Sequence, residues 1–230
     1  MTALTGKKNR SATATYALLV IFTASLLLPS ESIPADTNAA IVLQPEQFRK
    51  VDRFSGKGNY YGIVVDGTGN RYIRARYRPP EKPVRLGCKV PDSCGNCTSI
   101  AWDWRVETPP SGSSEKDPRR NDSGAGVYLI FKEALRTTVL KYVYSDSLPA
   151  GTVVRHDGIP LQRMMLVVKS SLASSPRGSW QHVDINFRND YLRLYKTETC
   201  PHLSAVAILT DGDQTASPVD AEYRDFILRR

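Results

Sequence analysis

The sequence predicts an all-β fold, a sandwich or barrel of short strands with one short helix, in a chain that is exported. Apolar and polar residues alternate along many short runs, which is typical of half-buried strands. Clusters of glycine, proline and aspartate separate these runs and mark turns. Near the N-terminus, a basic segment precedes a short apolar run. These three observations place the chain among exported all-β proteins.

The run Ser99–Val106 shows the alternation most clearly. On a pleated strand Trp102 and Trp104 point to one face, and Asp103 and Arg105 to the other. Two large rings on one face are typical of a core, so we expect the charged pair to be solvated. The alternative is that one of the two faces forms a ligand-binding surface.

The N-terminus resembles a secretory signal. Lys7, Lys8 and Arg10 precede residues 16–28, an apolar run of roughly 13 residues that is short of the ~20 needed to span a bilayer. Small residues follow, so we expect cleavage after Ser32 or Ala35. The predicted organisation is a signal peptide over 1–32, a linker over 33–45 and a single β-sandwich domain over 46–230. The predicted location is periplasmic or secreted, with no transmembrane span in the mature chain; an uncleaved anchor is the alternative.

The formal net charge is +8 at pH 7, and three of the 31 basic residues lie in the predicted signal peptide. The remaining basic residues are scattered, so the sequence does not predict a nucleic-acid partner. A basic face suits anionic polysaccharide or lipid head groups, although a solvated surface is the simpler interpretation.

The elements follow from the same patterns in chain order. Asp66–Gly69 has turn chemistry between two strand-like runs, which predicts a hairpin. Residues 107–124 are rich in proline, glycine, serine and charge, and are expected to form a long exposed loop. The predicted strands cover residues 60–66, 70–77, 84–90, 99–106, 126–131, 138–144, 163–169, 203–209 and 221–228, and the predicted helix covers 187–195.

Four segments together resemble a bacterial cell-envelope family known only as a domain of unknown function. They are residues 101–106, 121–131, 140–145, and 205–215 with 222–226. Where the family pattern has an acidic pair, this chain has Asn121 and Asp122, and Tyr144 stands where a second tryptophan is usual. The resemblance implies a jelly-roll β-sandwich similar to carbohydrate-binding and galactose-binding-like modules, and a fold does not by itself carry a function. The ligand-binding candidates that it indicates are Asp103, Arg105, Asp122, Tyr128, Tyr142, Asp211, Asp213 and Tyr223.

Four cysteines, an even number in an exported chain, indicate disulfides. Three pairings are possible. We expect Cys88 with Cys97, where two strands meet, which leaves Cys94 for Cys200. The Cys94–Cys97 spacing also suits a redox motif, and the four thiols with His202 suit a zinc site, but no βαβ pattern supports the first and one such spacing is weak support for the second.

The segment 211–215 offers clustered oxygen ligands after a strand. Ca²⁺ requires about six or more oxygens, and the EF-hand pattern is absent from this sequence. Asp122 contributes only if its loop converges with this segment. We therefore expect no cofactor, with calcium as the alternative and a capped, hydrogen-bonded turn as the preferred interpretation.

Three classes of function remain open. The preferred one is a non-catalytic module that binds a polar envelope ligand such as a glycan, through rings and polar side chains. An envelope hydrolase requires carboxylates about 5–10 Å apart around a scissile bond, and no nucleophile elbow is visible in the sequence. The third class is a structural or protein-interaction domain. Exposed rings distinguish the first class from the third, and convergence of Asp122, Asp211 and Asp213 in one cleft favours the second.

Overall fold

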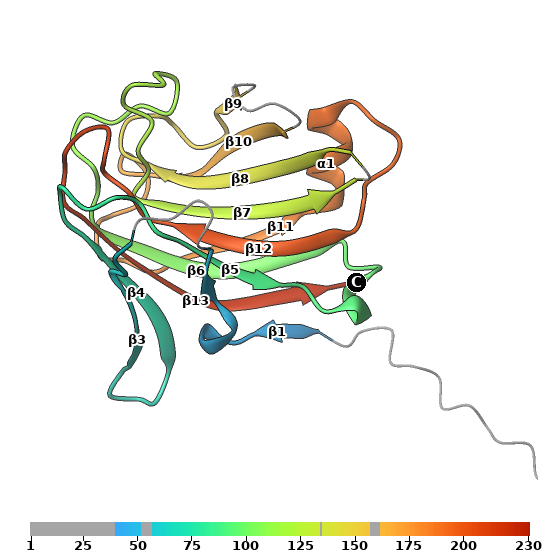
Figure 1. Cartoon of the computed structure of the whole chain (residues 1–230), viewed down its shortest axis with the longest axis horizontal. Coiled ribbons are helices and arrows are strands. Elements are labelled where there is room, and N and C mark those ends of the chain that lie inside the picture. The colour runs from blue at the N-terminus through green and yellow to red at the C-terminus, as the bar shows by residue number, and fades with distance from the viewer. Residues whose placement is uncertain (1–39, 52–56, 134, 157–161) are drawn as a thin grey trace, which may run out of the picture. The chain divides into compact units, whose positions relative to one another are not determined.

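The structure, a computed structural model, describes residues 40–51, 57–133, 135–156 and 162–230 (Figure 1). The predicted signal peptide, residues 1–32, lies outside the described residues and stays a prediction. Among the residues that are described, no helix has both the length and the apolar character needed to cross a membrane.

The first sheet contains six strands in the described part of the chain, and all its pairings are antiparallel. Its order is β11-β6-β13-β4-β3, and β1 pairs with the C-terminal part of β13. The strands are β1 (Ile41–Leu43), β3 (Tyr61–Val65), β4 (Arg71–Tyr77), β6 (Ser99–Thr108), β11 (Gln181–Asn186) and β13 (Val219–Arg229).

The second sheet contains seven strands in the order β2-β5-β12-β7-β8-β10-β9. Only β8 and β10 run parallel among these described strands. The strands are β2 (Arg49–Lys50), β5 (Arg85–Lys89), β7 (Ala125–Lys132), β8 (Thr137–Ser145), β9 (Val153–His156), β10 (Gln162–Ser171) and β12 (Leu203–Leu209).

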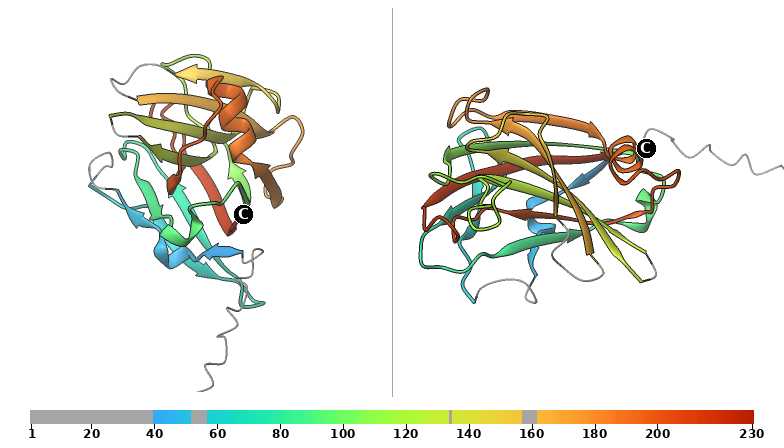
Figure 2. Two further views of the ribbon diagram at one scale, coloured as in Figure 1. Left: turned by 90° about the vertical axis from the view of Figure 1, so that its right-hand side faces the viewer. Right: turned by 90° about the horizontal axis from the view of Figure 1, so that it is seen from above.

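The two sheets pack face to face as a sandwich, which confirms the predicted fold class (Figures 1 and 2). The core between them holds the rings that the alternation places inside. Trp102 lies 5.4 Å from Trp104 and 5.7 Å from Tyr142, centroid to centroid, and all three side chains are fully buried. The opposite face of β6 carries Asp103 and Arg105, as the period of two requires.

The predicted helix forms as α1 (Phe187–Tyr195). The Asn186 side chain caps its start by accepting a hydrogen bond from the backbone N of Asn189 at 2.8 Å. The helix ends at Tyr195, and the following residue, Lys196, caps it with a left-handed φ of 52°. It covers one end of the sandwich (Figure 1) and buries three rings, Phe187, Tyr191 and Tyr195.

The β3–β4 hairpin is confirmed, with the backbone N of Asp66 donating to the backbone oxygen of Asn70 at 2.9 Å. The segment expected as a linker contains strand β1, in which Ile41 and Leu43 pair with Leu228 and Phe226 of β13. The segment 107–124 is not a fully exposed loop: Glu115 and Asp122 are completely buried. Strands β2, β9 and β11 were not predicted.

The predicted disulfide pairing is wrong. Cys94 is joined to Cys97, with their Cα atoms 5.0 Å apart, and Cys88 and Cys200 are free thiols. The cause is a tight turn that follows the short helix Asp92–Cys94, in which the backbone N of Cys97 donates to the backbone oxygen of Cys94 at 2.9 Å. The turn brings the two side chains together, whereas Cys88 points from β5 into the core.

Candidate functional site

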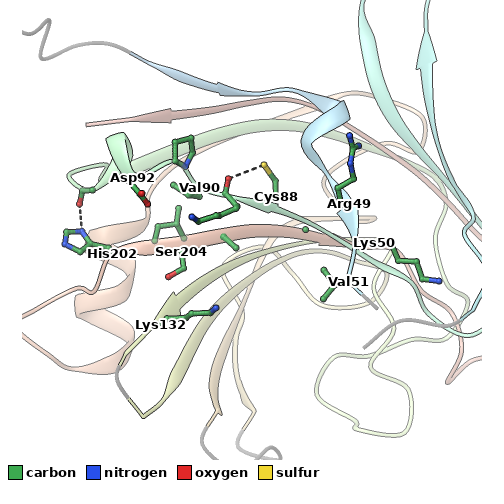
Figure 3. Close-up of a pocket in the computed structure, with 15 residues that line it drawn as sticks. Arg49, Lys50, Val51, Cys88, Val90, Asp92, Lys132, His202 and Ser204 are labelled. Carbon is green, nitrogen blue, oxygen red and sulfur yellow. Dashed lines mark hydrogen bonds between the residues drawn. The ribbon is translucent and has the colours of Figure 1, made fainter. Parts of the chain in front are cut away.

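A groove of about 780 Å³ lies along the outside of the second sheet, over β2, β5 and β12 (Figure 3). We call it the basic groove. Its charged lining consists of four cations and one carboxylate, and its floor is made by small and apolar residues. The charged residues and His202 come from five segments of the chain: Arg49 and Lys50, Lys89, Asp92, Lys132, and His202.

Strand register explains why the floor is open. Gly87 and Lys89 alternate with the inward-facing Leu86 and Cys88 on β5. Gly87 pairs with Ala207 of β12, so two small residues lie side by side across the two strands, and Ala205 pairs with Lys89. A Cβ at Gly87 would lie 2.9 Å from Cγ2 of Val51, so the glycine allows the chain after β2 to approach and form one wall.

The disulfide turn and the segment before β12 meet at one end of the basic groove. His202 donates a hydrogen bond from Nδ1 to the backbone oxygen of Gly95, as drawn in Figure 3. Asp92 lies in the same turn and supplies the groove's carboxylate. Since Lys89, Lys132 and Arg49 are exposed, their charges are available to a ligand.

The predicted acidic residues do converge. Asp122, Asp211 and Asp213 bring one oxygen each to within 4.8 Å of the others. Asp122 accepts hydrogen bonds from the backbone N and Oγ1 of Thr215, each at 2.7 Å, and from the backbone N of Gln214 at 3.3 Å. Asp122 therefore holds the turn after β12, as the preferred interpretation of this segment predicts.

Burial and mutual repulsion raise the pKa values in this acidic cluster. Burial, followed by the neighbouring carboxylates of Asp122 and Asp213, raises the pKa of Asp211 to about 7, although Lys141 opposes the rise. The pKa of Asp213 is raised by burial and by Asp122. The three carboxylates lie side by side, whereas hydrolysis of a glycosidic bond requires two that flank it.

The same cluster supplies the only group of three or more potential metal ligands found among the described residues. Three carboxylates offer fewer oxygens than the six or more that Ca²⁺ takes. Both oxygens of Asp122 already accept hydrogen bonds from the turn. The donor set therefore fits a capped turn better than a calcium site.

Tyr128 lies beside this cluster, on the outer face of the second sheet, and its ring is almost completely buried. Lys141 Nζ lies 5.3 Å from the ring centroid, and the guanidinium carbon of Arg85 lies 4.8 Å from it. Burial tends to lower the pKa of Lys141, but Tyr128, Asp211 and Glu115 raise it above its ordinary value. Lys141 is thus a buried cation that offsets the acidic cluster.

Tyr142 and Tyr223 belong to the core. The hydroxyl of Tyr142 donates to Asp190 Oδ2 at 3.0 Å, and that of Tyr223 donates to the backbone oxygen of Leu209 at 3.0 Å. Both rings are fully buried, as are Trp102 and Trp104. Ring stacking by these residues is therefore not available to a ligand.

Asp103 and Arg105 lie on the outer face of the first sheet. Asp103 accepts hydrogen bonds from Nδ1 of His182 at 2.7 Å and from Nη2 of Arg224 at 3.1 Å. Arg105 donates from Nε to Glu222 and lies over the half-buried ring of Trp180, with its guanidinium carbon 4.8 Å from the centroid. This face is thus a network of ion pairs around a tryptophan that the sequence analysis did not select.

Sequence reasoning also missed every residue of the basic groove except Cys88 and His202, which were considered only as thiol or zinc ligands. Lys89 alternates outward in a predicted strand, which is a usable signal. Arg49, Lys50 and Lys132 carry no local pattern that distinguishes them from other surface cations.

The fold and these sites define a two-sheet β-sandwich with a basic groove on the outside of one sheet. The chain belongs to the family described as "Protein of unknown function (DUF3047)", whose model matches residues 64–227. No curated protein matches the sequence.

Several solved structures have a similar backbone fold. The xyloglucanase domain of NopAA from Sinorhizobium fredii has 8% identity and a TM-score of 0.44, over 83% of this chain and 96% of that one. The endoglucanase cel12A from Rhodothermus marinus has 11% identity and a TM-score of 0.45, over 84% and 95%. A family 29 carbohydrate-binding module from Piromyces equi has 12% identity and a TM-score of 0.32, over 84% and 90%. Likenesses this distant carry no information about ligand or activity.

Proposed function

We propose that this chain is an exported, non-catalytic module that binds an acidic envelope glycan in the basic groove. The observation that supports the proposal is the lining of the groove, in which four cations and a single carboxylate surround a floor of small and apolar residues. Its volume of about 780 Å³ lies within the range of ligand sites. The location, periplasmic or secreted, depends on the predicted signal peptide over residues 1–32.

The ligand class follows from the charges. Lysine and arginine pair with the carboxylates of an acidic sugar, and Asp92 and backbone oxygens accept hydrogen bonds from hydroxyl groups. The floor, with Gly87 and Ala205, leaves space for a sugar ring against apolar atoms. Because the rings first expected to bind sugar, Tyr128, Tyr142 and Tyr223, are buried, the proposal rests on charge and shape.

Titration calorimetry with oligogalacturonate and with neutral dextran tests this proposal. We expect the purified chain to bind the acidic oligomer, more weakly as salt concentration rises. Lys89→Gln should weaken binding by about fivefold, the effect of losing one exposed ion pair. Lys116→Gln removes the same charge from an exposed loop and serves as the matched control. Equal affinity for dextran, or an equal loss in the control, contradicts the proposal.

The acidic cluster favours one second candidate, an envelope hydrolase. Asp211 has a pKa raised to about 7 by burial and lies next to Asp122 and Asp213, and perturbed carboxyl groups of this kind occur at catalytic sites. Release of reducing sugar from the acidic oligomer, abolished by Asp213→Asn in a variant that remains folded, would establish this function. If the wild-type chain releases no reducing sugar, it is not a hydrolase of that substrate.

A further inference from the structure

The outer face of the first sheet carries a second polar site, on the other sheet from the basic groove. A hollow of about 300 Å³ opens over β4, β6 and β13. We call it the arginine hollow. Its charged lining consists of four arginines, Arg74, Arg76, Arg78 and Arg105, and three carboxylates, Glu107, Asp220 and Glu222.

Strand register places these charges in rows. Glu222 on the central strand β13 pairs with Arg74 of β4 on one side and with Arg105 of β6 on the other. Asp220 lies opposite Arg76 in the next row. The charges therefore alternate across the sheet, and the excess of arginine leaves a cation without a matching carboxylate.

Glu222 positions two of the arginines. Its side chain is almost completely buried, and it accepts a hydrogen bond from Arg74 Nε at 2.6 Å and another from Arg105 Nε. Since both bonds leave from Nε, the terminal nitrogens point elsewhere. Among the described residues, Arg105 makes no side-chain hydrogen bond from its terminal nitrogens, and its side chain is 25% exposed.

Arg76 is the unmatched cation. It is exposed, and within the described ranges its side chain has neither an ion pair nor a hydrogen bond. The carboxylate opposite, Asp220, instead accepts a hydrogen bond from Arg78 Nη2 at 3.0 Å. The hollow thus contains one guanidinium without a partner and another, Arg105, with unused donors.

Trp180 fixes the orientation of Arg105. Its ring centroid lies 4.8 Å from the guanidinium carbon of Arg105 and 4.1 Å from that of Arg224, and the ring contacts Tyr72 edge to face at 5.8 Å. A stacked guanidinium held at Nε has few ways to turn, so its free donors are preorganised. Arg105 and the unpaired Arg76 line the same hollow, and preorganised donors together with an unpaired cation suit an anion.

We infer that the arginine hollow binds a small oxyanion, a carboxylate or sulfate group, between Arg76 and Arg105. The inference does not depend on the basic groove, which lies on the other sheet. The same oxyanion chemistry is present in a free anion and in the carboxylate of an acidic sugar. A sugar carboxylate differs in the hydroxyl groups of its ring, which can donate hydrogen bonds to the carboxylates that line the hollow.

Titration of the full chain with sodium glucuronate and, separately, with sodium acetate tests this inference. The probe signal is the indole N–H resonance of Trp180, assigned by its loss in Trp180→Phe. We expect a saturable shift that Arg76→Gln weakens by about tenfold. Arg105→Lys keeps the charge but removes the fork of donors, and it should weaken binding to a similar extent. Tighter binding of glucuronate than of acetate identifies a sugar-borne carboxylate, and equal binding identifies a free anion.

Two controls keep the test specific. Arg188→Gln removes one charge from α1, and Lys89→Gln removes one from the basic groove; neither should change the titration. The inference is overturned by the absence of a saturable shift, by unchanged binding in Arg76→Gln, or by an equal loss in Arg188→Gln. Loss of the Trp180 shift in Lys89→Gln would assign the binding to the basic groove, and it would also overturn the inference.

Discussion

Asp122 accepts two hydrogen bonds of 2.7 Å from Thr215, a residue 93 positions further along the chain. The segment before β7 is thereby tied to the turn after β12, and the tie is completely buried at Asp122. Hydrogen bonds to a charged group are each worth about 1.5–3 kcal/mol. This relationship makes Asp122 a structural residue, and the first prediction follows from it.

Asp122→Ala should lower the free energy of unfolding by about 2–3 kcal/mol, because the turn loses its acceptor and buried N–H groups lose their partner. Chemical denaturation followed by circular dichroism measures this change. Asp213→Asn is the matched control, since it removes a neighbouring, exposed carboxylate and relieves repulsion. Equal stability of the wild type and Asp122→Ala would contradict the structural role.

Stability should fall as pH rises from about 4 to about 7. Burial raises the pKa of Asp211 from 3.8 to about 7, so in that interval the folded chain holds a proton that the unfolded chain has lost. The stabilisation is present below the unfolded pKa and is lost as pH passes the folded one. Glu115, whose pKa burial also raises, acts in the same direction.

Asp211→Asn isolates the contribution of Asp211 to this pH dependence. The variant cannot ionise, so its free energy of unfolding should fall less steeply over the interval and exceed that of the wild type near pH 7. A series of denaturant melts at fixed ionic strength measures both quantities. An identical pH slope in the two proteins would show that Asp211 is already ionised in the folded state.

Two alkylation labels are expected without reductant, and four with it. Cys94 and Cys97 are joined, whereas Cys88 and Cys200 are free. Labelling in denaturant followed by intact-mass measurement counts the thiols directly. In the folded chain Cys200 should react before Cys88, which is 2% exposed, although burial raises the pKa of Cys200 to about 11 and slows it. No label in denaturant would indicate a second disulfide.

Tyr142 distinguishes a core role from a binding role. Tyr142→Ala should cost about 3–5 kcal/mol, because it empties a fully buried site beside Trp102. Tyr142→Phe should cost about 1 kcal/mol through loss of the hydrogen bond to Asp190. Thermal melts provide the stabilities, and calorimetry on Tyr142→Phe should show unchanged affinity for oligogalacturonate. Weaker binding of oligogalacturonate by Tyr142→Phe would show that Tyr142 belongs to the ligand site.

The sequence predicts the layers of this fold because period-two alternation reports which face is buried. It places Trp102 and Trp104 inside and Asp103 outside, and the helical pattern over residues 187–195 predicts α1. Local sequence patterns do not show which strands pair with each other. The parallel alignment of β8 with β10 and the two-residue strand β2 depend on partners distant in sequence.

The sites divide in the same way. The acidic cluster was identified because Asp211 and Asp213 are two positions apart in sequence and the family pattern selects Asp122. The basic groove was missed because Lys89 and Lys132 are brought together only when β12 lies between β5 and β7. The free thiols were missed because a turn of a few residues decides the pairing, and spacing alone permits three pairings.

Glu222 provides the last prediction, because one buried carboxylate holds two guanidinium groups. Glu222→Gln keeps the shape of the side chain but removes the buried counter-charge that Arg74 and Arg105 share. Breaking a fully buried ion pair costs about 3–5 kcal/mol, and both arginines are partly exposed, with 31% and 25% of their side chains accessible. Water therefore screens part of the loss, and we expect a cost of roughly 1–3 kcal/mol. The matched control is Glu107→Gln, because the Glu107 carboxylate is half exposed and lies 3.8 Å from Arg105 Nε. In denaturant melts we expect Glu222→Gln to lose more free energy of unfolding than Glu107→Gln. If both variants were as stable as the wild type, Glu222 would not be the residue that positions the arginine hollow.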